Sequence, residues 1–125
     1  MNTDVIVRSS WKAWLKAATF ESAERVAQRL FVATGQPIDA RQLERYEQGG
    51  FVVRWACDHP PQPWEDLVVD VLRRAQQLAH GFQLLGSIDD EVRVVATTAS
   101  GAHFKVPGVT MISCDAVRER TLPYV

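Results

Sequence analysis

Two stretches of the chain repeat apolar side chains at the spacing of an α-helix. The longer stretch covers residues 63–80, with apolar positions at Trp64, Leu67, Val68, Val71, Leu72, Ala75, Leu78 and Ala79. These positions form one continuous stripe, which predicts a helix with Pro63 at its first position and Gly81 at its end. A second stripe predicts a helix that is capped by Thr19 and closed by Gly35.

Other segments have the composition and alternation of β-strands. Strands are expected at residues 5–17, 51–57, 91–97 and 109–114, with a short apolar run at 82–85. In the first strand Trp11 and Trp14 have opposite parity, so one of them should face away from the main core. Trp64 belongs to the helical stripe and is expected in the core.

Residues 38–48 carry two conflicting signals. Asp39 with Gln42 imitates a capping box, which would suit a short helix. The dipeptide Gly49-Gly50 is instead typical of a two-residue hairpin connection, and it leads into a β-rich segment. We favour a hairpin in which residues 43–48 pair with the strand that follows, and the helix stays the alternative.

The predicted element order is β-α-β-β-α-β followed by further strands. This order indicates an α+β fold, in which two helices pack on one face of an antiparallel sheet. The arrangement is a split β-α-β, or ferredoxin-like, order with extra C-terminal strands. Residues 1–125 are expected to form a single domain, with 115–125 as a polar and loosely held tail.

Composition narrows the class of protein. The chain is 46% hydrophobic and 23% charged, as in an ordinary globular domain, and no apolar run approaches the roughly 18 residues of a membrane span. The N-terminus lacks the pattern of a signal peptide, so a cytoplasmic location is expected. Cys57 and Cys114 do not form a disulfide framework and are expected to be small buried residues. A net charge of −1 gives no argument for nucleic-acid or membrane binding.

Few residues have the spacing of a catalytic or metal site. Cys57 and His59 form one Cys-x-His pair, whereas a zinc site needs four ligands and a catalytic thiol needs an accessible position. The carboxylates Glu65 and Asp66 complement the helix dipole, and Asp70 has arginines at helical spacing. Phosphate-binding loops, nucleophile elbows and zinc-protease motifs are absent. The sequence therefore predicts no catalytic residue, no cofactor and no metal, and hence not an enzyme.

Three segments resemble small bacterial immunity proteins of toxin–immunity systems. They are residues 46–53 (YEQGGFVV), residues 64–86, which begin WEDLVVDVL, and residues 106–112 (VPGVTMI). The resemblance implies a protein that binds a cognate toxin domain and blocks its active site or its access to substrate. It carries over no binding residue by position, because such sequences diverge quickly.

Charge and parity suggest which residues would contact such a partner. Acidic residues gather between positions 58 and 70 and again at 89–91, and acidic patches favour docking of a basic partner. The predicted contact residues are Asp58, Glu65, Asp66, Asp70, Asp89, Asp90 and Glu91, with the aromatic anchors Trp14 and Tyr46. Whether the chain is a monomer or a homodimer is left open.

Two alternatives from other classes remain. One is a homodimeric α+β domain that binds a small molecule between its sheet and its helices, with His59 or His103 among the polar groups of the pocket. The other is a structural or adaptor component of a larger assembly.

Overall fold

The structure is a computed structural model that describes residues 7–36 and 42–118. Its two α-helices are α1 (Phe20–Thr34) and α2 (Trp64–Gln76), and a short 3₁₀ turn, η2, covers Thr98–Ser100. The strands are β1 (Val7–Leu15), β2 (Leu43–Arg45), β3 (Phe51–His59), β4 (Ala79–His80), β5 (Gln83–Leu85), β6 (Glu91–Thr97), β7 (His103–Phe104) and β8 (Val109–Val117). The protein is therefore an α+β domain, as the sequence predicts.

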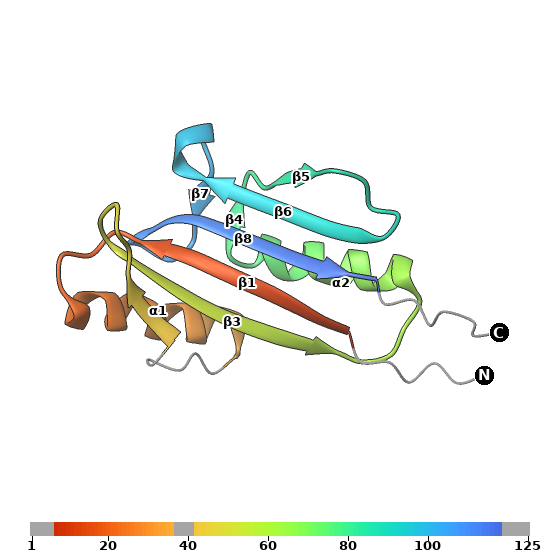
Figure 1. The fold of residues 1–125 in the computed structure, drawn as a ribbon, viewed down its shortest axis with the longest axis horizontal. Helices are drawn as coiled ribbons and strands as arrows, with labels where there is room; N and C mark the ends of the chain where they lie inside the picture. The colour runs from red at the N-terminus through yellow and green to blue at the C-terminus, as the bar shows by residue number, and fades with distance from the viewer. Residues whose placement is uncertain (1–6, 37–41, 119–125) are drawn as a thin grey trace.

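The main sheet has six strands in the order β2-β3-β1-β8-β6-β5, and every neighbouring pair is antiparallel. β1 lies near its centre, with β3 on one side and β8 on the other (Figure 1). Strands β4 and β7 form a separate two-stranded sheet. No helix among the described residues is long and apolar enough to cross a membrane.

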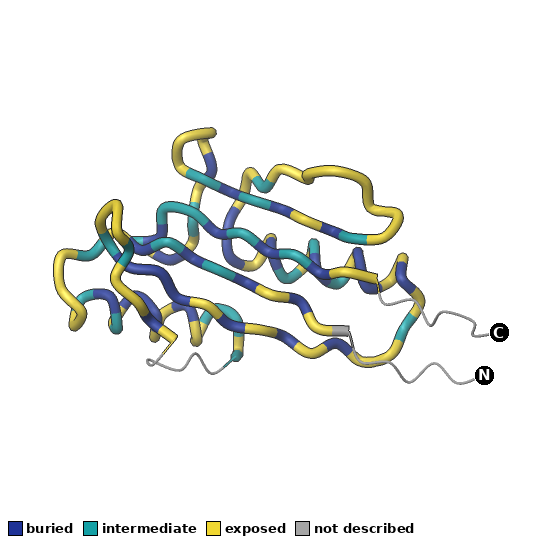
Figure 2. Tube along the Cα trace, in the orientation of Figure 1, coloured by how far each residue is buried: buried dark blue, intermediate teal, exposed yellow. Residues whose placement is uncertain are grey.

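One face of the sheet carries the apolar core. Trp11, Ala13 and Leu15 of β1 are buried, whereas Lys12 and Trp14 between them are only half-buried, so the predicted alternation is confirmed. Buried residues alternate in the same way with exposed ones from Val53 to His59 of β3, and with exposed or half-buried ones along β6 (Figure 2). The buried residues of α1 and α2 belong to the same apolar cluster as these inward-facing strand residues. Trp64 is part of this core, as predicted.

Helix α1 has the predicted ends. The Thr19 side chain accepts a hydrogen bond from the Ser22 backbone N–H, which satisfies one of the unpaired donors of the first turn. Gly35 ends the helix in the left-handed region, with φ 71°, and its N–H donates to the Phe31 carbonyl. Both ends follow from local sequence chemistry.

Helix α2 differs from its prediction at both ends. Pro63 is the N-cap in an extended conformation instead of the first helical residue, and the helix ends at Gln76 well before Gly81. The Leu78 carbonyl accepts a hydrogen bond from the Lys105 N–H, and the next two residues pair with β7. Leu78 and Ala79 are both buried, which explains why the apolar stripe continues to Ala79. Their backbone hydrogen bonds, however, do not continue the helix.

The hairpin is confirmed, but its connection is longer than predicted. β2 stops at Arg45, so residues 46–50 join the two strands in place of Gly49-Gly50 alone. The end of the chain also differs, because β8 continues to Val117 instead of entering a tail at Asp115. Ala116 is buried and pairs with Ser9 and Val92, which explains the extension. Residues 5–6, the segment 38–41 and the predicted tail from 119 lie outside the described residues.

Position 50, in the connection between β2 and β3, requires glycine. Its φ is 78°, and a Cβ at this position would overlap the carbonyl oxygen of Leu15. Gly49, its neighbour in the same turn, also has a positive φ of 108° but has nothing within 4 Å of a Cβ. Gly50→Ala should therefore lower the free energy of unfolding by more than about 2 kcal/mol, and Gly49→Ala by only about 1 kcal/mol.

Urea denaturation followed by circular dichroism measures both variants. Equal losses of stability would show that the Leu15 carbonyl does not restrict position 50.

Candidate functional site

The only buried polar side chains among the described residues, Ser9 and His59, lie in one hydrogen-bonded chain. The Trp11 Nε1–H donates to Ser9 Oγ at 2.8 Å, and Ser9 Oγ lies 2.7 Å from His59 Nε2. On the other side of the ring, His59 Nδ1 lies 2.7 Å from Asp70 Oδ2, to which Arg74 Nε donates at 3.3 Å. We call these five residues the Ser9–Asp70 network. It links β1 and β3 to α2.

The donors and acceptors of the network fix its direction. The Asp70 carboxylate can only accept, so His59 Nδ1 donates to it. With the ring proton on Nδ1, Nε2 is the acceptor of the Ser9 hydroxyl hydrogen, while Ser9 Oγ accepts from the Trp11 indole N–H, which can only donate. Every member of the network is satisfied in this arrangement, which agrees with the lack of unpaired buried side-chain atoms in the described part of the chain.

The network contains serine, histidine and aspartate in the order of a hydrolase triad, but its serine is closed off. Ser9 is 0% exposed and His59 is 1% exposed. A nucleophilic serine must reach the substrate carbonyl, and here Oγ is covered by protein and already accepts the Trp11 indole hydrogen. The geometry is that of a structural link between sheet and helix.

Ionisable groups near the network have shifted pKa values. Burial by itself would raise the pKa of Asp70, but the hydrogen bond from His59 and the charge of Arg74 outweigh it, so the pKa lies below its usual value. Burial raises the pKa of the Cys57 thiol, and Arg74 opposes this only in part. Burial also raises the pKa of Cys114. Both cysteines are free and buried, as predicted, and neither has the lowered pKa of a reactive thiol.

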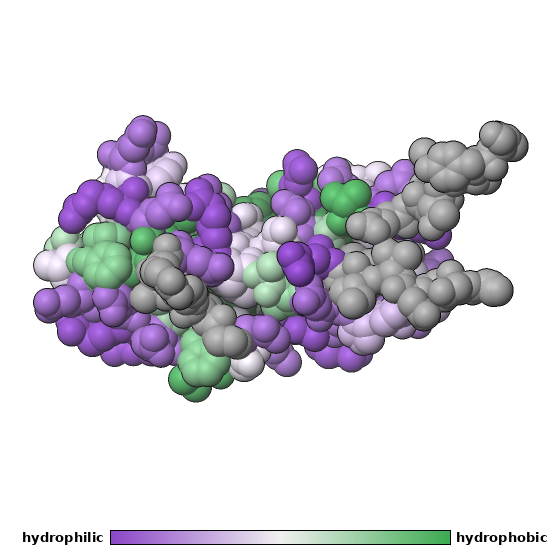
Figure 3. All heavy atoms as spheres, turned by 60° about the horizontal axis from the view of Figure 1, so that its bottom comes forward, coloured by the Kyte–Doolittle hydropathy of each residue, from purple (hydrophilic) through white to green (hydrophobic). Residues whose placement is uncertain are grey.

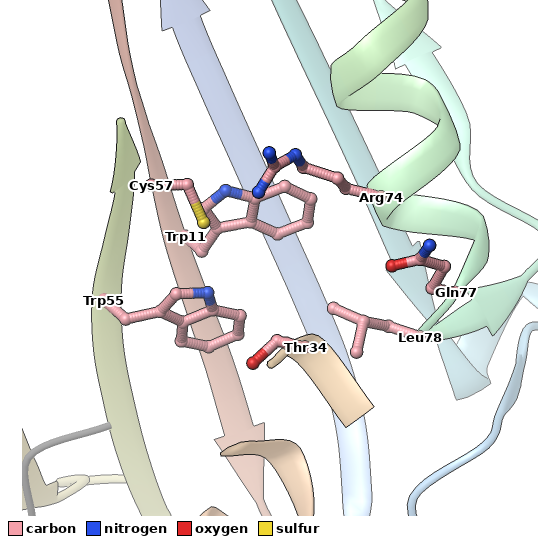
Figure 4. Close-up of a pocket in the computed structure, with 7 residues that line it drawn as sticks. All are labelled: Trp11, Thr34, Trp55, Cys57, Arg74, Gln77 and Leu78. Carbon is pink, nitrogen blue, oxygen red and sulfur yellow. The ribbon is translucent and has the colours of Figure 1, made fainter. Parts of the chain in front are cut away.

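A cavity of about 10 Å³, at the lower limit of the space that one water molecule needs, lies beside the network, between the sheet and the two helices (Figure 4). Trp11 and Trp55 form one wall, with their rings stacked at 5.9 Å between centroids and 12° between planes. Arg74 reaches toward them from α2, and Thr34 closes the side formed by the end of α1. Neither His59 nor His103 lines this cavity.

Most of the predicted acidic contact residues gather at one end of the sheet, where α2 begins and where the loop between β5 and β6 lies (Figure 1). The Trp64 Nε1–H donates to the Ile88 carbonyl at 2.7 Å and joins this loop to α2. Arg118, after β8, donates its N–H to the Asp90 carbonyl at 2.6 Å. We call this region the acidic end. Its carboxylates are those of Asp58, Glu65, Asp66, Asp89, Asp90 and Glu91, and three arginines lie among them: Arg8 pairs with Asp58, Arg93 pairs with Glu91 at 3.6 Å, and Arg118 donates to the Asp89 carbonyl.

The acidic residues differ in their exposure and in the ion pairs that their side chains form. Glu65 and Asp66 are exposed in the first turn of α2. Asp58 is also exposed but pairs with Arg8 at 2.8 Å, which raises the pKa of Arg8. Asp70 is half-buried within the Ser9–Asp70 network, and its Oδ2 is bonded to both His59 and Arg74. Its side chain holds α2 to the sheet, and a contact with a partner stays a prediction.

The predicted anchors Trp14 and Tyr46 lie together, but away from the acidic end. Both are half-buried and line one open groove beside the β2–β3 connection. Trp14 and Arg8 are six positions apart on β1, which separates the groove from the Asp58 pair by roughly 20 Å. A single partner would have to extend along the sheet to reach both groups.

The exposed apolar residues form no continuous patch on the face shown in Figure 3, where hydrophobic surface is scattered among hydrophilic side chains. The most exposed large apolar residue in the described part of the chain is Val32, at 78%. Among the described residues, no three His, Cys, Asp or Glu side chains lie close enough together to hold a metal ion.

The network was not foreseen from the sequence. The spacing of Asp70 and Arg74 indicated a helical ion pair, and His59 shares its parity with Cys57, but neither signal identifies Ser9 as the partner of His59. That partnership depends on the register in which β1 pairs with β3.

Comparison of the chain with protein-family models, with curated proteins and with solved structures found no match.

Asp70→Asn should lower the free energy of unfolding by about 1–2 kcal/mol at pH 7, because the helix loses a charged acceptor for His59 and Arg74. Since the pKa of Asp70 is lower in the folded than in the unfolded chain, its contribution is fully present above the unfolded pKa of about 4. The contribution is lost as the pH falls through the folded pKa, so wild type and variant should converge in stability in acid.

Urea denaturation at neutral pH and near pH 3 measures this difference. Asp66→Asn, an exposed position on the same helix, is the matched control and should change stability by only a few tenths of a kcal/mol at either pH. A loss for Asp70→Asn that is independent of pH would contradict the assignment.

Proposed function

We propose that this chain is a cytoplasmic, non-enzymatic immunity protein that binds a cognate bacterial toxin domain and occludes its active site or its access to substrate. The main support for the proposal is that acidic residues from two segments that are distant in the sequence meet at the acidic end. Glu65 and Asp66 lie 24 residues or so before Asp89 and Asp90 in sequence, yet the bond between Trp64 and the Ile88 carbonyl joins their two segments. The resemblance of three segments to immunity proteins is its second support.

The electrostatics of the acidic end suit such a partner. Exposed carboxylates accelerate association with a basic surface and select against acidic partners, more than they add affinity. A specific interface needs roughly 800 Å² on each partner. The first turn of α2 and the loop of residues 86–90 offer neighbouring, firmly held surfaces for such an interface.

We further propose that the chain uses a ferredoxin-like, split β-α-β arrangement with both helices on one sheet face. The element order β-α-β-β-α and the single apolar cluster that includes both helices support this arrangement. In it, β5 and β6 are additions between α2 and β8. The opposite face of the sheet would stay open to a partner.

Charge reversal at the acidic end tests the function. The chain is tagged in its native host at its own expression level, and the captured partner is identified by mass spectrometry. We expect one partner in equal amount that is toxic when expressed without this chain. Glu65→Lys should weaken its capture by about tenfold or more, because it places a cation in the interface.

Glu21→Lys is the matched control. Glu21 is an exposed acid in the first turn of α1, so its reversal costs the same interaction with a helix dipole and leaves the acidic end intact. If both variants protect equally well against the toxin, or if the captured partner is harmless, the proposal is wrong.

A further inference from the structure

The groove beside the β2–β3 connection has a volume of about 670 Å³ and lies at the other end of the sheet from the acidic end. We propose that it binds an extended, acidic peptide segment of a partner protein that carries an aromatic or large apolar side chain. This inference does not depend on the proposed function, because it concerns a separate surface with the opposite charge preference.

Two aromatic side chains form the walls of the groove. Trp14 comes from β1 and Tyr46 from the β2–β3 connection, and each is half-buried, so each is held by the protein and still offers surface. The Lys12 ammonium lies 4.6 Å from the centroid of the Trp14 ring and supports the indole. Tryptophan and tyrosine are the side chains that most often dominate the binding energy of an interface, because they bury a large area with few rotatable bonds.

The backbone around the groove is fixed before any partner arrives. The Tyr46 N–H donates to the Gly50 carbonyl at 3.0 Å, and the Gly49 N–H donates to the Tyr46 carbonyl at 3.0 Å. Thr110 Oγ1 donates to the Trp14 carbonyl and so connects β8 to the same region. The two glycines leave this part of the groove without side chains, so another backbone can approach closely. A pre-formed site loses little entropy on binding.

The charge of the groove selects the chemistry of its occupant. Lys16 lines it and is exposed, and Lys12 lies against the Trp14 ring. None of the residues that line the groove is acidic. An occupant with carboxylates would therefore gain both faster association and correct orientation from the lysines, whereas a basic segment would be repelled.

The test follows the indole resonances of the ¹⁵N-labelled full chain by NMR. The titrant is a short fluorescein-labelled peptide in which glutamate alternates with phenylalanine, and the control peptide has lysine in place of glutamate. We expect the Trp14 indole resonance to shift with the glutamate peptide. The three other tryptophans, Trp11, Trp55 and Trp64, are at least nine-tenths buried and serve as internal references that should not move.

Fluorescence anisotropy with the same peptide measures the contribution of single side chains. Lys16→Glu and Tyr46→Ala should each weaken binding by about tenfold or more. Lys105→Glu reverses an exposed lysine that does not line the groove, so it should bind as wild type does. Lys16 and Tyr46 lie outside the apolar core, and circular dichroism verifies that both variants are folded.

Three results would overturn the inference. The first is the absence of a Trp14 shift with the glutamate peptide. The second is an equal shift with the lysine peptide, which would remove the charge argument. The third is a Trp14 resonance that depends on protein concentration without any peptide, which would identify a second copy of the chain as the occupant.

Discussion

The alternation of side chains along β1 is the constraint on which the rest of the structure depends. β1 pairs with β3 on one side and with β8 on the other, so its register determines that of the central sheet. A slip of one residue would exchange the two faces and bring Lys12 and Trp14 into the core in place of Trp11 and Ala13. The same alternation sends Ser9 inward to His59 and Trp14 outward to the groove. One strand thus determines both the internal contacts and the surface available to a partner.

The Ser9–Asp70 network adds specificity to a core that would otherwise be held by shape alone. Apolar packing tolerates many exchanges of similar volume, whereas a buried polar group must find its own partner or incur the cost of lost hydration. His59 can be satisfied on both ring nitrogens only when β1, β3 and α2 occupy their observed positions together. The small cavity beside the network is lined by the two stacked indole rings of the sheet, by Arg74 of α2 and by Thr34 at the end of α1.

Local chemistry allowed the element types and many of their ends to be predicted, and long-range pairing limited the rest. Thr19 and Gly35 determine the ends of α1 through hydrogen bonds with residues a few positions away, so the sequence contains enough information. The end of α2 depends on Lys105, which lies 27 positions beyond Leu78 and donates to its carbonyl. No pattern in the sequence near Leu78 predicts this partner. Gly49-Gly50 predicts the hairpin, but not that β2 stops pairing at Arg45 or that Gly50 lies against the Leu15 carbonyl at the end of β1. The network and the groove arise in the same way, from side chains that only the completed sheet brings together.

The near-neutral net charge of the chain conceals two surfaces of different character. A net charge of −1 sums carboxylates and cations over the entire sequence, and it does not record where they lie. The fold places exposed carboxylates at one end of the sheet, around the start of α2, and a lysine-bearing aromatic groove at the other end. Electrostatic guidance acts over about one Debye length, roughly 8 Å in physiological salt, so surfaces some 20 Å apart act on their partners independently. For a protein of this size, the local charge around each surface is therefore a better guide to its partners than the total.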